Sequence, residues 1–195
     1  IIDIFTPDMP FIVDSVLAAI RAKGGVIRFV AHPILPLDPD TFRILGEMAP
    51  GARLESFLHL HIDPLPDEAA RAALAEELGA VLDEVALAVR GWRPMLERLR
   101  QLVQDLRENP PPVDLDMLGE SVQFLGWLAG HNFTFLGLRE YSVGGTPESP
   151  TLEPIAGSGV GLLDDPAFRC LRHGQDLVEM TPEHAAFLAS PDVLL

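Results

Sequence analysis

The chain has 195 residues, 48% of them apolar and 22% charged, so it can bury the core of one large domain or two small ones without disulfides. Its 14 basic and 29 acidic residues give a formal net charge of −15, which argues against nucleic acid or an anionic membrane as a partner. The single cysteine, Cys170, excludes an internal disulfide and fits a reducing cytoplasm, and no apolar run is long enough to predict a membrane span.

The opening residues predict a strand, a helix and a second strand. The first apolar run reads as a short buried strand that ends at a turn, where Thr6 or Asp8 is placed to cap the helix. The helix is indicated by apolar residues at helical spacing, namely Val13, Val16, Leu17 and Ile20. Residues 26–31 alternate as a strand does, which puts His32 on the opposite face from Phe29. Three prolines, Pro33, Pro36 and Pro39, are expected to end this strand.

A further strand is predicted at residues 56–62. Its residues alternate between an apolar face and a face that carries Phe57, His59 and His61. The order strand, helix, strand, strand, helix over residues 1–90 predicts an α+β fold with a split β-α-β sheet of the ferredoxin-like type. That fold requires one more strand.

A long helix follows, with an apolar stripe that begins at Leu74 and with Asp67 as its N-cap. Gly91-Trp92-Arg93-Pro94 is expected to break or kink this helix, with Trp92 as a core anchor at the bend. The prolines at 110–112 end it and mark a domain boundary.

Two domains are therefore predicted, at residues 1–109 and 113–195. The second starts with a helix and continues with a strand at 133–143, which either completes the first sheet or opens a second, partial α/β module. A short helix is expected at 181–189. Because the chain starts on a strand-like run and with Ile1, we expect it to be a segment of a longer protein.

Three histidines are the only candidates for a metal site. His59 and His61 lie on one face of a predicted strand, and His32 could lie on the neighbouring strand. Three converging imidazoles suit zinc, but the usual zinc spacings are absent, so a polar sheet face is the preferred interpretation.

The string Gly157-Ser158-Gly159-Val160-Gly161 matches no complete catalytic motif. It lacks the spacing of a dinucleotide-binding loop, and Ala156 stands where a nucleophile elbow needs its first glycine. A tight turn is the preferred interpretation.

The turn before the first helix is the one feature with a binding rationale. Asp8-Met9-Pro10-Phe11 precedes a helix start, whose free N–H groups suit a carboxylate such as that of an amino acid. The alternative is helix capping by Asp8 with Phe11 in the core. Asp14, six residues after Asp8, is expected to face solvent or another module, although a catalytic carboxylate pair is conceivable.

Six strings together resemble the opening of the large bacterial NAD-specific glutamate dehydrogenases. They occur in order over residues 1 to about 165, at positions 8–16, 30–35, 55–60, 91–95, 133–141 and 157–162. The resemblance implies a parent enzyme that oxidises L-glutamate to 2-oxoglutarate and ammonia and reduces NAD. It also implies that the catalytic domain and the NAD site lie downstream, so that this chain has no catalytic residue and no cofactor of its own.

The family also carries regulatory modules of the ACT type, which agrees with the predicted order of elements. Amino-acid-binding ACT domains typically have Asp-x-Pro-Gly at the first turn, and here Phe11 replaces the glycine. The expected role is therefore regulation and assembly in a cytoplasmic homo-oligomer. Its partners would be other domains and subunits, with a possible amino-acid effector at Asp8, Met9, Pro10, Phe11 and Asp14. A sensor domain of another protein and a metalloenzyme built on the three histidines are the alternatives.

Overall fold

The computed structural model describes residues 1–38, 40–41, 43–46, 51–146 and 149–165. These form two compact units that divide at Val89 and Arg90. Cys170 and the helix predicted at 181–189 lie outside the described residues. Within the described part, no helix is both long and apolar enough to cross a membrane.

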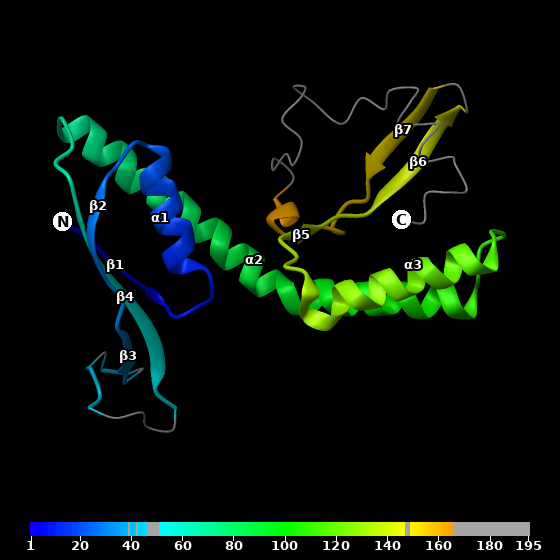
Figure 1. Ribbon diagram of the computed structural model, residues 1–195, viewed down its shortest axis with the longest axis horizontal. Helices are drawn as coiled ribbons and strands as arrows, with labels where there is room; N and C mark the ends of the chain where they lie inside the picture. Colours follow the sequence, from blue (N-terminus) through cyan, green and yellow to red (C-terminus); the bar gives the residue numbers. More distant parts are fainter. Residues whose placement is uncertain (39, 42, 47–50, 147–148, 166–195) are drawn as a thin grey trace. The chain divides into compact units, whose positions relative to one another are not determined.

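The first unit is a four-stranded antiparallel sheet with helices packed on it (Figure 1). The long strand β4 (Arg53–Ile62) is central and pairs with β1 (Ile2–Pro7) on one side. On its other side it pairs with β2 (Ile27–Ala31) and then with β3 (Ile34–Leu37). Helix α1 (Ile12–Ala22) connects β1 to β2. The predicted mixed fold with an antiparallel sheet is confirmed.

One face of this sheet carries the core. Alternation along β4 turns Leu58 and Leu60 to this face, and both are fully buried. Val16 and Ile20 of α1 cover them, because they lie four residues apart on one side of the helix. The start of α2 (Glu68–Glu108) adds Leu74 and Leu78 to the same cluster, among others. Asp67 caps α2 as predicted, since its Oδ1 accepts from the backbone N–H of Ala70 at 2.8 Å.

The second strand, β2, ends at Ala31, directly before His32 and Pro33, as the prolines predicted. A separate strand, β3, continues the sheet and contains Pro36, which pairs with Leu54. Of the named strands β3 pairs with β4 alone, so it lies at an edge, where a residue without an N–H is tolerated.

The predicted strand at 133–143 is in fact two short strands, and neither joins the first sheet. Strand β5 (Gly137–Leu138) pairs with β8 (Val160–Gly161), and β6 (Tyr141–Thr146) pairs with β7 (Ser149–Pro154). In the described part of the chain no strand pairs with the outer edge of β1. The extra strand of the full ferredoxin-like order is therefore not seen there.

Of the break or kink predicted at residues 91–94, the break is wrong, because α2 runs as one helix of 41 residues with Pro94 inside it. Gly91 has a different role: a Cβ at this position would lie 2.6 Å from Cα of Gly161, so the glycine lets β8 approach the helix. The prediction that Trp92 is a core anchor is wrong, because Trp92 is 38% exposed with its ring against His131, whereas Met95 and Leu96 are buried.

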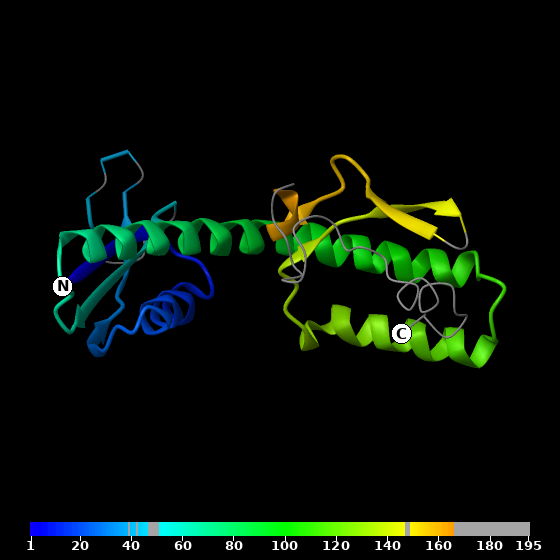
Figure 2. The ribbon, with the colours of Figure 1, turned by 90° about the horizontal axis from the view of Figure 1, so that it is seen from above.

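The second unit packs α3 (Leu115–Trp127) along the end of α2 (Figure 2). Asp114 caps α3 by accepting from the backbone N–H groups of Asp116 and Met117. Val103, Leu118 and Val122 form the buried centre of this contact. A π-helical turn, η1 (Leu128–Asn132), follows α3, and a 3₁₀ turn, η2 (Leu162–Asp164), follows β8. The predicted boundary at the prolines after residue 109 thus falls inside this unit, because the second half of α2 belongs to its core.

Candidate functional site

Neither Thr6 nor Asp8, the two predicted caps in the turn from β1 to α1, is the N-cap of the helix. Phe11 is the residue at the N-cap, and no side chain bonds to the first turn of α1. Its backbone has φ 71° and ψ −1°, the left-handed region that favours glycine. The Phe11 side chain is 51% exposed, so the prediction that it packs in the core is wrong. Met9 packs against the edge of the core.

Asp8 is held by the sheet instead of the helix. Its Oδ1 accepts a hydrogen bond of 2.6 Å from Oγ of Ser56, and its backbone N–H donates to the carbonyl of Leu54 at 3.0 Å. Oγ of Ser56 is also 2.8 Å from Nε2 of His32. A hydroxyl that donates to Asp8 can accept from His32. His32, Ser56 and Asp8 are thus linked by two consecutive hydrogen bonds, which we call the polar relay. This polar relay joins β1, β4 and the end of β2.

The order of the relay does not suit nucleophilic catalysis. A catalytic triad places the histidine between the nucleophile and the carboxylate, so that the base takes the hydroxyl proton. Here the serine stands between the other two and is fully buried. The relay therefore holds the turn on the sheet. Asp14 is exposed on α1, and among the described residues it makes no hydrogen bond to Asp8, so these two carboxylates do not form a catalytic pair.

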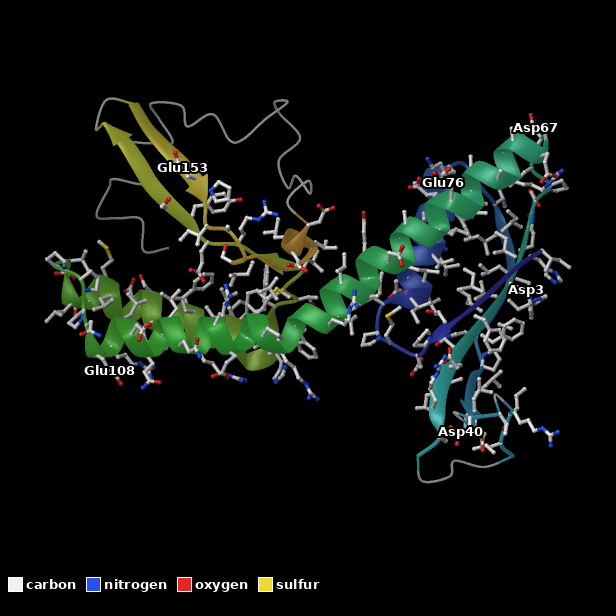
Figure 3. The ribbon with its side chains drawn as sticks, turned by 180° about the vertical axis from the view of Figure 1, so that it is seen from behind. Asp3, Asp40, Asp67, Glu76, Glu108 and Glu153 are labelled. Carbon is white, nitrogen blue, oxygen red and sulfur yellow. The ribbon has the colours of Figure 1, made fainter. Side chains whose placement is uncertain are left out.

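The open face of the sheet collects the remaining histidines. Nε2 of His59 is 2.9 Å from Nε2 of His61, and Nδ1 of His59 is 2.5 Å from Oδ1 of Asp3. Phe29 lies beside both imidazoles, with ring centroids 6.2 Å from His59 and 5.3 Å from His61. Figure 3 labels Asp3 on β1, the strand that pairs with β4.

The three histidines that the sequence suggested as a cluster do not converge. Ala31 is the β2 partner of His59, so His32 follows the end of the strand and turns to Ser56 instead. Among the residues that the structure describes, no group of three His, Cys, Asp or Glu side chains could hold a metal ion.

The glycine-rich segment of the second unit is a close-packed turn. A Cβ on Gly159 would lie 2.1 Å from the carbonyl oxygen of Leu163, and one on Gly161 would lie 2.4 Å from that of Leu136. Ser158 is buried, and its Oγ donates to the carbonyl of Ile155 at 2.7 Å and accepts from the N–H of Glu140. In the part of the chain that the structure describes, no imidazole or carboxylate bonds to this hydroxyl, so Ser158 has a structural role there.

Sequence reasoning missed three residues that organise these regions. Ser56 could have been found, because it is a polar residue at an apolar-face position of an alternating strand. Arg98 and Arg139 carry no local signal, since they bind backbone carbonyls far along the chain. Arg98 donates to Ser158 at 2.8 Å, and Arg139 donates to Leu163 at 2.6 Å.

The comparisons with known proteins agree on one family. Residues 1–78 match the family model described as "Glutamate dehydrogenase, ACT1 domain". The chain is 32% identical over 172 residues to the NAD-specific glutamate dehydrogenase of Halomonas elongata, a match that covers 83% of this chain and 11% of the relative. It is 28% identical over 201 residues to that of Pseudomonas aeruginosa, which covers 99% of this chain and 12% of the relative.

The chain thus spans about a tenth of the length of these curated relatives. No solved structure matches it.

Proposed function

Because residues 1–78 belong to the ACT1 domain family of glutamate dehydrogenases, we propose that this chain is the N-terminal regulatory and assembly region of an NAD-dependent glutamate dehydrogenase. The parent enzyme converts L-glutamate, NAD and water to 2-oxoglutarate, ammonia and NADH. NAD binds elsewhere in the parent, and this region takes no part in the chemistry.

The observation that carries the proposal is the extent of the match. Similarity to the relative from Pseudomonas aeruginosa extends over 99% of this chain, beyond the ACT1 domain, yet covers 12% of that enzyme. The side chains agree with a role away from catalysis. Neither of the two buried serine clusters, around Ser56 and Ser158, has the order of groups that activates a nucleophile.

Exposed apolar side chains support a role in assembly. The open face of the first sheet carries Phe5 and Phe29, both about half exposed. In the second unit, Phe124 and Trp127 stack at 6.1 Å and are also exposed. Exposed apolar side chains that lie together often mark contact surfaces. The proposed partners are other domains and subunits of the same cytoplasmic homo-oligomer.

Sedimentation velocity on the parent enzyme tests this role, with and without residues 1–195. We expect the shortened enzyme to lose part of its oligomeric assembly or its response to amino-acid effectors. An enzyme that keeps both its assembly and every effector response after the deletion would overturn the proposal.

The uncapped start of α1 favours a second candidate, an amino-acid sensor. The free N–H groups of a helix N-terminus attract a carboxylate, and Asp8, which precedes the N-cap residue Phe11, has the charge to pair with the ammonium group of an amino acid. Thermal unfolding of the chain with each amino acid tests this candidate. A higher midpoint that Asp8→Asn abolishes would support it, and no change with any amino acid would exclude it.

A further inference from the structure

We propose that His59 and His61 bind a borderline transition-metal dication, such as Zn²⁺ or Cu²⁺, on the open face of the first sheet. The two Nε2 atoms lie 2.9 Å apart and share a hydrogen bond, so one ion that replaces the bridging proton can reach both nitrogens. Residues at i and i+2 on a strand share a face, which is why alternating histidines point the same way. The two imidazoles form a bidentate site, and two more ligands complete a tetrahedron.

Asp3 prepares His59 for this role. Its Oδ1 lies 2.5 Å from Nδ1 of His59, so the ring N–H donates to the carboxylate. This bond places the proton on Nδ1, so Nε2 of His59 accepts from Nε2–H of His61 and can bind an ion once that proton moves to Nδ1 of His61. A carboxylate behind a histidine ligand is the usual way in which proteins orient the ring and raise its basicity. Asp3 is therefore a positioning residue.

The surrounding sheet keeps the two rings in place. His59 has a partner on each side, Asp3 of β1 and Ala31 of β2, so its backbone belongs to the middle of the sheet. Phe29 packs beside both imidazoles, and Phe57 lies 6.2 Å from His59. Ligands on a rigid element lose little freedom when they bind an ion.

The donor atoms select the class of metal. Imidazole nitrogen suits Zn²⁺, Cu²⁺ and Ni²⁺, whereas Mg²⁺ and Ca²⁺ require several oxygen ligands. The net charge of −15 also favours the approach of a cation. Water, or a side chain of another module of the parent, would fill the open positions. The site does not depend on the proposed function, and its test uses no enzyme activity.

The test is a titration of the full chain, purified without a histidine tag, with ZnCl₂ in a calorimeter. We expect one equivalent of Zn²⁺ to bind, and His59→Ala and His61→Ala each to weaken binding about tenfold or more. His32→Gln is the matched control, because Ser56 holds this imidazole away from the pair, and it should bind Zn²⁺ like the wild type. Asp3→Asn should weaken binding about tenfold while both nitrogens stay bound.

Two further measurements separate loss of a metal ligand from loss of the fold. Circular dichroism confirms that each variant retains its structure, and the nitrogen couplings of bound Cu²⁺ in electron spin resonance count the imidazoles in the wild type. We expect two coupled nitrogens. No binding by the wild type, an unchanged affinity in a folded double variant of His59 and His61, or a loss in His32→Gln equal to that in His59→Ala would overturn the proposal.

Discussion

Phe11 has a backbone conformation that does not suit its bulky side chain. Its φ of 71° lies in the left-handed region, which a bulky side chain rarely adopts. Its ring is half exposed. The related turn in amino-acid-binding ACT domains typically has glycine here. The turn therefore keeps the backbone conformation that glycine prefers, although its residue is phenylalanine.

Phe11→Gly is expected to raise the free energy of unfolding by about 1 kcal/mol relative to Phe11→Ala. The left-handed conformation costs a residue with a Cβ about 1–2 kcal/mol, and the greater freedom of glycine in the unfolded chain offsets part of this gain. Thermal unfolding followed by circular dichroism measures the difference. Phe11→Ala is the matched control, since it removes the ring and keeps the Cβ. Equal stability of the two variants would mean that the turn is not strained.

Asp63 and Arg28 form an exposed bidentate pair with both distances 2.7 Å. Hydrogen bonds from Arg28, with its positive charge adding to them, lower the pKa of Asp63 below its usual value of about 3.8. A lowered native pKa stabilises the fold above the unfolded pKa. This stabilisation is lost as the pH falls from about 3.8 through the native pKa.

An NMR titration of the Asp63 carboxyl carbon tests this pair. The midpoint should lie below 3.8 in the wild type and return toward 3.8 in Arg28→Gln. Added salt should also raise the midpoint in the wild type, because both groups are exposed. A midpoint that Arg28→Gln leaves unchanged would show that the pair does not form in solution.

At the scale of elements, β4 joins the turn to the sheet through Ser56. Ser56→Ala should destabilise the first unit by about 2 kcal/mol, because it leaves the Asp8 carboxylate and His32 without their shared partner. Hydrogen exchange of the β4 amides measures this loss.

Ser121 of α3 is the matched control. It is equally buried, but its Oγ has no hydrogen-bond partner in the described part of the chain. Ser121→Ala should therefore be neutral or stabilise α3 by up to about 1 kcal/mol. Similar losses from the two alanines would contradict the relay.

The turn between β7 and η2 depends on its glycines. Gly161→Ala should destabilise the second unit by about 3 kcal/mol, because its Cβ would meet the carbonyl of Leu136 and its φ is 65°. Gly119 in α3 has open space around it, so Gly119→Ala should stabilise the same unit by up to about 1 kcal/mol. Urea unfolding followed by tryptophan fluorescence tests both, since Trp92 and Trp127 lie in this unit. A Gly161→Ala variant as stable as the wild type would contradict this packing.

Local patterns predicted most elements of the first unit. Alternation located β4 and its two faces, and helical spacing located α1 and the start of α2. Patterns failed where a distant contact overrides local preference. Gly91 and Pro94 resemble a helix break, yet α2 continues through both, and the glycine at 91 leaves room for Gly161.

The polar relay also could not be predicted from local sequence patterns. Ser56 lies 48 residues from Asp8 and 24 from His32, and no spacing rule joins positions so far apart. The same holds for the link between Asp3 and His59, which are 56 residues apart and meet only through the register of β1 on β4.

At the scale of the whole molecule, two units carry separate cores. The ACT1 domain match ends at residue 78, but similarity to the dehydrogenases continues through the second unit. Residues of both units are therefore matched in the relative from Pseudomonas aeruginosa. A regulatory role requires that effector binding or docking at these units favours one of two states of the catalytic domain.

The most direct test is glutamate-dependent reduction of NAD by three preparations: the intact parent, the parent without residues 1–195, and the 195-residue chain. We expect NADH production by the intact parent and by the parent without residues 1–195, and none by the isolated chain. NADH production by the isolated chain, or no glutamate-dependent reduction by the intact parent, would contradict the central claim.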